Sequence, residues 1–408
     1  MNFPKLSRKF QAVCNTLFSQ ELRMTRRKFL KVLAAAVAAI AAGLGGAAWA
    51  ILRQTKFGAL PEGEALRRIL ASPHFRDGEF QNIVPIHILN TNDSLATGFI
   101  KSLFIKRVNP TPPAPIPSQR VNLHALDRKQ DLIIWLGHSS FFLQLGGVRF
   151  LLDPVFSPHA SPFFFAVRAF PGTNPYTAED FPDIDCLLLS HDHWDHLDYP
   201  TVMALQGKVK QIVCGLGVGA HLRRWGFPET MIHETDWGDM LDLWPNLRIH
   251  VTTASHFSGR TLKRNQSLWA GFLLESRATA KTDTASENRR IFFSGDGGYA
   301  PHFAEIGRRF GGVDLAVLDS GQYNERWRRV HMTPEDAVQA ALDLNARYYL
   351  PAHIGKFVLA YHPWDEPFKR AVAASQGKPF GLATPMLGQV VPIGDSIPEY
   401  PHWWEHLA

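Results

Sequence analysis

The chain has 408 residues, 45% of them apolar and 20% charged, which fits one large globular domain with additions or two ordinary domains and excludes a wholly disordered chain. The net charge of +6 arises in the first 53 residues, which hold nine lysines and arginines against one acidic residue, whereas the other 355 hold 34 basic and 36 acidic residues. Because this body has no basic excess to neutralise a run of phosphates, we expect no nucleic-acid partner.

The first predicted element is an apolar segment near the N-terminus. Arg26 and Arg27 precede residues 32–52, a run of 21 residues without a charge that is rich in alanine and glycine. Paired arginines before such a run resemble a twin-arginine export signal, and AWA at 48–50 offers a cleavage site of small residues. Met24, taken as the start, would place the arginines where such signals carry them. The run is also long enough for an uncleaved membrane anchor, and a buried core helix is the third interpretation.

These patterns divide the chain into three parts. Residues 1–53 form the export signal or membrane anchor, 54–130 form an N-terminal extension, and 131–408 form the main domain. The extension contains a proline-dense stretch at 109–119, which we interpret as an extended surface connector rather than a ligand for a proline-binding domain. We expect an exported protein, either periplasmic or anchored to the inner membrane.

Strand patterns dominate from residue 131 onwards, with helices between them. LIIWLGHSSFFLQLGGVRFLLDPVF predicts three strands with a hairpin turn at Gly146 and Gly147. The apolar DCLLL predicts a fully buried strand, and Thr333 followed by Pro334 predicts the start of a helix over 333–345. Further strands are predicted from KQIVCG, LRIHVTT, LWAGFLLES, RIFF, DLAVLD and RYYL. This pattern predicts an α/β layered sandwich.

Polar residues recur where the predicted strands end. The endings SH, ASH, SGD and PAH place His191, His256, Asp296 and His353 where the chain leaves the sheet. Side chains held on loops above rigid strands make a preorganised site.

The segment HDHWDH contains metal-ligating residue types at metal-binding spacing. His191 and His193 are separated by one residue, so on an extended segment both face the same side and can bind one ion. Asp195 and His196 follow immediately and can face a second ion beside the first. So many polar groups after an apolar strand would be costly to bury without compensation.

Three further residues complete two adjacent sites. Asp296 can supply a carboxylate that bridges the two cations, His256 can complete the first site, and His353 the second. Such nitrogen and oxygen ligands suit two Zn²⁺ ions, with Mn²⁺ or Fe²⁺ as alternatives. The predicted metal ligands are His191, His193, Asp195, His196, His256, Asp296 and His353.

SHDHWDHLD, followed in order by ASH, SGD and PAH, resembles the metallo-β-lactamase-fold hydrolases over about residues 131–395. The resemblance implies a four-layer αββα sandwich with the metals at one edge of the two sheets. It also implies the same seven metal ligands that the residue pattern predicts. SPHFRDGEFQN, VHMTPEDAV and HIGKF resemble the N-acylphosphatidylethanolamine-hydrolysing phospholipase D branch, whose pattern the bacterial ascorbate-phosphate lactonases partly share. Trp194 stands where the mammalian phospholipases have tyrosine, and residues 163–176 depart from the branch, so the substrate does not follow from the resemblance.

Two cations that share a water lower its pKa toward about 7, and the resulting bridging hydroxide can attack phosphorus or a carbonyl carbon. Asp195 and Asp296 are expected to orient this nucleophile as well as to bind metal. His331 is a candidate to hydrogen-bond the scissile group or to protonate the leaving oxygen, and a structural histidine before a helix is the alternative.

Three residues outside the ligand set are candidates for supporting roles. In the pattern of the family, His138 and Asp153 lie at strand ends near the metals, where they would support the ligands. Arg260 is a candidate to contact a phosphate, and an ordinary surface salt bridge is the alternative.

These observations lead to three hypotheses about function. The leading one is a binuclear phosphodiesterase of phospholipase D type that acts on N-acylphosphatidylethanolamine-like lipids at a membrane surface. A lactonase or other ester hydrolase with the same metal site is the second hypothesis. A non-catalytic, metal-bound surface protein is the third, and the complete ligand set argues against it. The sequence does not predict the oligomeric state.

Overall fold

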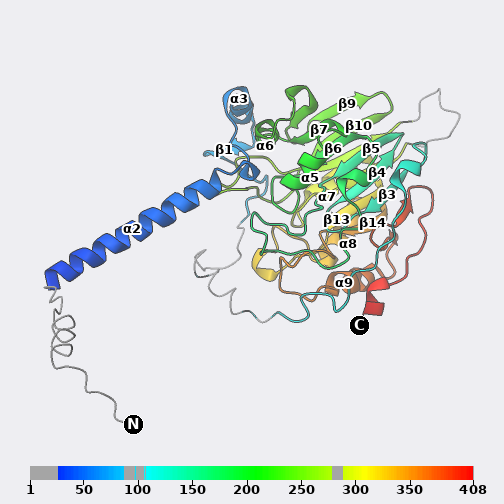
Figure 1. The fold of residues 1–408 in the computed structure, drawn as a ribbon. Coiled ribbons are helices and arrows are strands. Elements are labelled where there is room, and N and C mark those ends of the chain that lie inside the picture. Colours follow the sequence, from blue (N-terminus) through cyan, green and yellow to red (C-terminus); the bar gives the residue numbers. More distant parts are fainter. Residues whose placement is uncertain (1–25, 87–96, 98–104, 106, 278–287, 408) are drawn as a thin grey trace, which may run out of the picture. The chain divides into compact units, whose positions relative to one another are not determined.

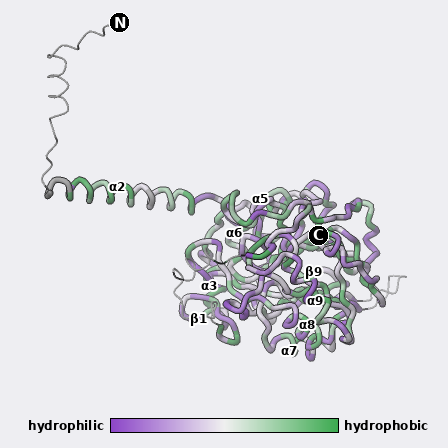
Figure 2. Tube along the Cα trace, turned by 90° about the horizontal axis from the view of Figure 1, so that it is seen from below, coloured by the Kyte–Doolittle hydropathy of each residue, from purple (hydrophilic) through white to green (hydrophobic). Residues whose placement is uncertain are grey.

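The computed structural model describes residues 26–86, 97, 105, 107–277 and 288–407, so Met24 lies outside the described residues. The chain divides into two compact units, residues 1–54 and 55–408. In the first unit, helix α2 (Arg26–Leu52) contains a stretch of 23 residues, Leu30–Leu52, that is long and apolar enough to cross a membrane. Figure 2 shows apolar residues recurring along this helix. A signal sequence has the same length and composition, and the buried core helix stays the third prediction.

The second unit is built on two seven-stranded sheets (Figure 1). The first has the order β16 (Val390–Pro392), β3 (Leu132–Trp135), β4 (Phe141–Leu145), β5 (Val148–Leu152), β6 (Ile184–Leu189), β7 (Val209–Gly215) and β8 (Ile232–Thr235). The second has the order β15 (Gly381–Leu382), β14 (Ala346–Ala352), β13 (Val313–Asp319), β12 (Arg290–Phe293), β11 (Gly271–Ser276), β10 (Leu247–Thr252) and β9 (Met240–Trp244). Each sheet joins a run of antiparallel strands to a run of parallel ones.

Helices cover the outer faces of both sheets. They are α5 (Tyr199–Ala204) and α6 (Gly219–Arg224) on the first sheet, and α7 (His302–Phe310), α8 (Pro334–Asp343) and α9 (Glu366–Ser375) on the second. Successive side chains of a strand point to opposite faces. In β3, Ile133 and Trp135 therefore enter the core between the sheets, whereas Leu132 and Ile134 pack in the core that α5 and α6 share. The layers run helix, sheet, sheet, helix, which confirms the four-layer αββα sandwich.

From residue 55 on, the described part of the predicted extension belongs to the second unit and packs on its two sheets. Ile69, Phe80 and Ile116 are buried in the core between the sheets, while most of the stretch at 109–119 is exposed. The treatment of residues 54–130 as a separate extension remains a prediction. The minor elements are α3 (Gly63–Ala71), β1 (Phe75–Arg76), β2 (Glu79–Phe80), η1 (Thr55–Phe57), η2 (Leu123–Ala125), η3 (Ala178–Asp180), η4 (Glu229–Met231), η5 (Glu325–Trp327) and η6 (Trp403–Leu407).

Two local predictions from the sequence are confirmed. Gly146 and Gly147 both have positive φ, 57° and 79°, as a two-residue hairpin turn of the primed type requires. Helix α8 begins at Pro334, and the Thr333 side chain accepts a hydrogen bond from the backbone N–H of Asp336.

His302, the first residue of α7, gives stability a measurable pH dependence. Burial lowers the pKa of His302 to about 4 from its usual 6.5. Between pH 6.5 and 4, His302 is protonated in the unfolded chain but not in the folded one. The contribution of neutral His302 to the free energy of unfolding is therefore complete above pH 6.5 and is lost as the pH falls toward 4. The variant His302→Phe keeps a ring beside Phe303 but has no group that titrates. When the pH is lowered from 7.5 to 5, we expect the free energy of unfolding to fall by about 2 kcal/mol less in this variant than in the wild type. Urea unfolding at both pH values measures this, and equal losses would contradict it.

Candidate metal centre

The ends of four strands bring the predicted ligands to one edge of the sandwich. His191 lies two residues after β6 in the first sheet, whereas His256, Asp296 and His353 follow β10, β12 and β14 of the second. The sheets direct apolar residues into their cores up to this edge, and the predicted ligands follow where the strands end. The candidate centre therefore draws on both sheets.

Three histidine nitrogens converge on a first position. His191 Nε2 lies 2.8 Å from His193 Nδ1, which is 3.3 Å from His256 Nε2. One ring nitrogen from each of these histidines lies within 4.8 Å of the others, a spacing that suits one metal ion.

A second cluster lies around the carboxylate of Asp195. Its Oδ2 is 3.7 Å from His196 Nε2 and 4.0 Å from His353 Nε2. His138 Nε2 lies 2.9 Å from the same oxygen, and this histidine belongs to the same group of four neighbouring residues. Asp195, His196 and His353 are the residues that we predicted for a second ion.

Asp296 lies between the two clusters. Its Oδ2 is 3.0 Å from His196 Nε2 in the second cluster, and it is 3.9 Å from His256 Nε2 and 4.0 Å from His191 Nε2 in the first. Its Oδ1 is 3.0 Å from His353 Nδ1. One carboxylate thus reaches both positions, as a bridging ligand must.

Metal binding requires neutral imidazoles and ionised carboxylates. Burial, together with the neighbouring histidines, holds the pKa values of His191 and His256 well below the usual range. Burial acts against ionisation of Asp296, but His196 and His353 hold the pKa of its carboxyl well below the usual range. His196 is the exception among these groups: burial acts against its protonation, but Asp296 and Asp195 hold its pKa well above the usual range, so an ion would have to displace its proton. The buried His353 Nε2 has no hydrogen-bond partner among the described residues, so its lone pair is available to an ion. The residues present therefore fit a pair of metal ions.

The backbone around the centre adopts unfavourable conformations. His138, Asp153 and His353 have positive φ values of 56°, 37° and 62°, a region that side-chain-bearing residues rarely occupy. Gly295 also has positive φ, and a Cβ there would lie 2.8 Å from the Ala270 carbonyl oxygen. Such strain concentrates at functional sites, where the surrounding structure holds it in place.

Hydrogen bonds to the remaining ring nitrogens orient the ligands. Asp153 Oδ2 is 2.7 Å from His196 Nδ1, and His256 Nδ1 donates to the Val330 carbonyl oxygen at 2.9 Å. The backbone N–H and the hydroxyl of Ser190 also donate to Asp153, at 2.8 and 2.5 Å. The structure thus places Asp153, like His138, where the sequence analysis expected a support.

His331 lies at the rim of the same cluster, and its catalytic role remains a prediction. Its Nδ1 is 2.8 Å from Asp319 Oδ2 and 4.0 Å from Asp296 Oδ2, and its ring stacks on that of His353. Burial acts against protonation, but the Asp319 carboxylate raises the pKa of His331. Sequence analysis missed Asp319, although it ends β13 as the other polar residues end their strands.

Both predictions for Arg260 are wrong. The side chain is buried, and its guanidinium lies 3.8 Å from the centre of the Trp194 ring. It donates to the backbone oxygens of Asp192, Leu197 and Lys56, at 3.1, 2.5 and 2.9 Å. Burial lowers its pKa to about 10. Arg260 therefore braces the HDHWDH segment and forms neither a phosphate contact nor a surface salt bridge.

Asp192 was also missed, and it braces the same segment. Its Oδ1 accepts from the Gly259 N–H at 2.6 Å, and its Oδ2 accepts from the Ser267 hydroxyl at 2.9 Å. His221 Nε2 lies 3.2 Å from that Oδ2. The aspartate in the middle of the motif thus fixes the loop rather than facing the two clusters.

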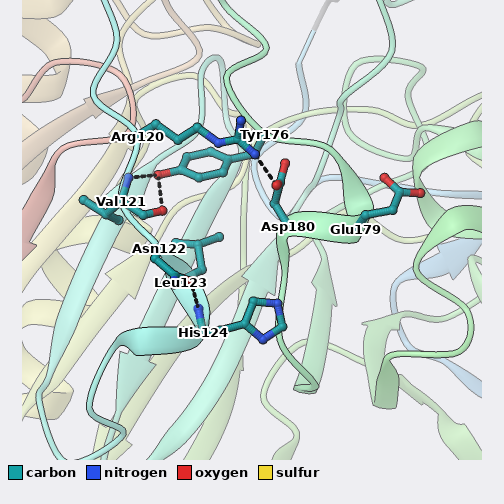
Figure 3. Close-up of a pocket in the computed structure, with 8 residues that line it drawn as sticks. All are labelled: Arg120, Val121, Asn122, Leu123, His124, Tyr176, Glu179 and Asp180. Carbon is teal, nitrogen blue, oxygen red and sulfur yellow. Dashed lines mark hydrogen bonds and ion pairs between the residues drawn. The ribbon is translucent and has the colours of Figure 1, made fainter.

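A pocket of about 410 Å³ lies apart from these residues (Figure 3). Among its lining residues, Arg120 pairs with Asp180, and the Tyr176 hydroxyl accepts from the Val121 N–H at 2.8 Å. None of the predicted metal ligands lines it.

Comparisons with known proteins agree with this geometry. The family model of the beta-lactamase superfamily domain matches residues 148–354. An uncharacterised protein of Mycobacterium tuberculosis is 36% identical over 337 residues, which cover 82% of this chain and 87% of that protein. N-acyl-phosphatidylethanolamine-hydrolyzing phospholipase D 1 of Caenorhabditis elegans is 32% identical over 237 residues, or 55% of this chain and 63% of that protein, less than two thirds of its length. A possible metal-dependent hydrolase from Veillonella parvula has the same fold, with a TM-score of 0.50 at 15% identity over 64% of this chain and 99% of that chain.

Proposed function

The chain belongs to the metallo-β-lactamase superfamily and is a metal-dependent hydrolase, and from this premise we propose that it is a binuclear phosphodiesterase of phospholipase D type. The position of Asp296 carries the proposal, because one carboxylate lies between two clusters that each offer three further ligands. Two metal sites joined by a carboxylate are an arrangement that can stabilise both the attacking and the leaving oxygen of a displacement at phosphorus.

We assign the first ion to three histidines and the second to the Asp195 cluster, with Asp296 shared. Zinc suits these nitrogen and oxygen ligands, and Mn²⁺ and Fe²⁺ are the alternatives. When bound, the pair of ions would lower the pKa of a water and stabilise negative charge on the scissile group. The proposed ligands are His191, His193, His256, Asp195, His196, His353 and Asp296.

Residues of the chain then supply orientation and a proton. Asp195 and Asp296 would orient the reacting water, and His138 would keep Asp195 in place through its 2.9 Å contact. His331 is the candidate proton donor to the leaving oxygen, because its ring lies at the rim of the cluster and Asp319 favours its protonated form.

The role of His331 predicts a leaving-group effect. We expect His331→Gln to lower kcat about 100-fold for a diester with an alkoxide leaving group, which needs a proton. The same variant should lose less than about threefold with a p-nitrophenolate leaving group, which needs none. Steady-state kinetics on both diesters, with metal content measured in parallel, gives the comparison. Equal losses on the two substrates would show that His331 does not donate the proton.

We propose N-acylphosphatidylethanolamine-like lipids as the substrate class. The likeness to the nematode phospholipase supports this choice, and so does an apolar helix that could place the enzyme at a membrane. A test offers the metal-loaded full chain N-acylphosphatidylethanolamine in mixed micelles and, separately, a panel of lactones, with Asp296→Ala as the inactive control. Release of an N-acylethanolamine supports the proposal. Lactone opening alone contradicts it, as does failure on both with two metals bound.

We also propose that the N-terminal segment exports the chain and leaves it periplasmic or anchored to the inner membrane. The paired arginines and the uncharged helix support this proposal. N-terminal sequencing of the mature protein tests it: a chain beginning at Ile51 indicates cleavage after Ala50, and an intact chain in the membrane fraction indicates an anchor. An intact chain in the cytosol would contradict both forms of the proposal.

A further inference from the structure

A loop close to the candidate metal centre exposes three consecutive phenylalanines. In this phenylalanine loop (residues 160–167), Phe163, Phe164 and Phe165 are 40%, 71% and 67% exposed. The Phe165 ring contacts the other two, with ring centres 5.6 and 5.5 Å apart. Single exposed apolar residues are common, but a contiguous aromatic tip is characteristic of a surface that binds a partner.

The phenylalanine loop has a closed, ordered base. The Ala160 N–H donates to the Val167 carbonyl at 2.9 Å, and the Ala169 N–H donates to Pro158 at the same distance. Val167 has a φ of 49°, which is highly unfavourable for a β-branched residue. Strain of this kind persists only where the surrounding structure maintains it, so the tip is held in an exposed position.

The base of the phenylalanine loop packs against the wall of the metal centre. Ala160 is buried with Val155 and Phe357, and the Phe357 ring lies 5.1 Å from that of His138. His138 in turn holds Asp195, a proposed metal ligand. Any surface that receives the loop therefore also fixes the orientation of the metal centre.

The loop also adjoins the first residues of its unit. Lys56 Nζ donates to the Pro162 carbonyl at 2.6 Å, and Lys56 follows Leu52, the last residue of α2, by four positions. Four residues span at most about 14 Å. If α2 is embedded in a membrane, its covalent link keeps Lys56, and with it Pro162, close to the membrane surface.

A second exposed apolar residue lies near the same lysine. Arg260 donates to the Lys56 carbonyl, and Leu262, two residues further on, is 86% exposed. Lys263 and Arg264 follow it and are exposed. Apolar side chains beside exposed cations are the combination that binds the surface of an anionic bilayer.

We propose that the phenylalanine loop and Leu262 insert into the interface of a lipid bilayer and hold the metal centre against the membrane surface. This inference rests on the proposed function, because it explains how a lipid headgroup would reach the metals. The cations and the short link to α2 favour a bilayer over a second copy of the chain as the occupant.

The first test measures insertion without using activity. A fluorophore on Phe164→Cys, in full-length Cys14→Ser protein, is placed in phosphatidylcholine and phosphatidylglycerol vesicles that contain a lipid-borne quencher; the other two cysteines are buried. We expect about half of the emission to be quenched. The matched control is Met240→Cys, an exposed apolar position on β9, which should stay unquenched. Absence of quenching at position 164, or self-quenching between labelled chains, would overturn the proposal.

The second test separates docking from substrate choice. We expect a variant with Phe163→Ser, Phe164→Ser and Phe165→Ser to lose about tenfold in turnover of lipid in vesicles, with unchanged turnover of a soluble diester and unchanged metal content. Full vesicle turnover by this variant, together with an unquenched label, would refute docking and leave the proposed function intact. A quenched label with no lipid turnover by the wild type would support docking and refute the proposed substrate.

Discussion

Replacing Asp296 with alanine is expected to remove at least one of the two metal ions and to lower kcat by at least about 10³-fold. This carboxylate reaches both clusters, through Oδ2 at 3.0 Å from His196 Nε2 and 3.9 Å from His256 Nε2. Without it, two cations would stand side by side with no anion between them, so their mutual repulsion would expel at least one. Elemental analysis after gel filtration and kinetics on a soluble diester measure the two effects.

A matched control separates loss of a ligand from loss of any buried carboxylate at this edge. Asp319 ends the neighbouring strand β13, is fully buried, and contacts His331 rather than the two clusters. We expect Asp319→Asn to keep two metal equivalents while slowing the reaction through His331. Two retained equivalents in Asp296→Ala, or its retained activity, would refute the binuclear mechanism.

Most strands of the two sheets could be predicted because each strand is recognisable from its own residues. Apolar runs such as DCLLL, which lies in β6, are buried on both faces, so they can be predicted as strands without knowing which strands pair with them. The edge strands β8, β9, β15 and β16 were not predicted. Strand β9 is half exposed along its length, and β15 has only two residues, so pairing with distant strands decides both.

Residues of the candidate site could be predicted from the sequence because one rule, a polar residue at the end of a strand, applies to several strands. The structure brings all seven predicted ligands together, and their binding of metal remains a prediction. The environment of Arg260 could not be predicted in this way, because its hydrogen-bond partners lie 63 or more residues away in the chain. Nothing local distinguishes an arginine that binds backbone carbonyls under Trp194 from one that awaits a phosphate. Only the packed loops decide between them.

The carboxylate of Asp153 is expected to control how tightly the second ion is held. It accepts hydrogen bonds from the backbone N–H and the hydroxyl of Ser190 and contacts His196 Nδ1 at 2.7 Å, which aims the opposite nitrogen of that ring at the metal position. We expect Asp153→Ala to weaken binding of one zinc ion about 10- to 100-fold. It should also lower the free energy of unfolding by about 3 kcal/mol, because buried donors lose their acceptor and alanine is disfavoured at a φ of 37°.

A second variant separates these two effects. Asp153→Asn keeps an acceptor for the Ser190 N–H and tolerates positive φ, but its amide nitrogen cannot accept from His196. This variant should therefore keep most of the free energy of unfolding, while its affinity for zinc falls by as much as that of Asp153→Ala. Chelator competition measures the affinity, and urea unfolding of the metal-free proteins measures the stability. Wild-type affinity in Asp153→Asn would show that packing alone, and not the hydrogen bond to Asp153, orients His196 toward the metal.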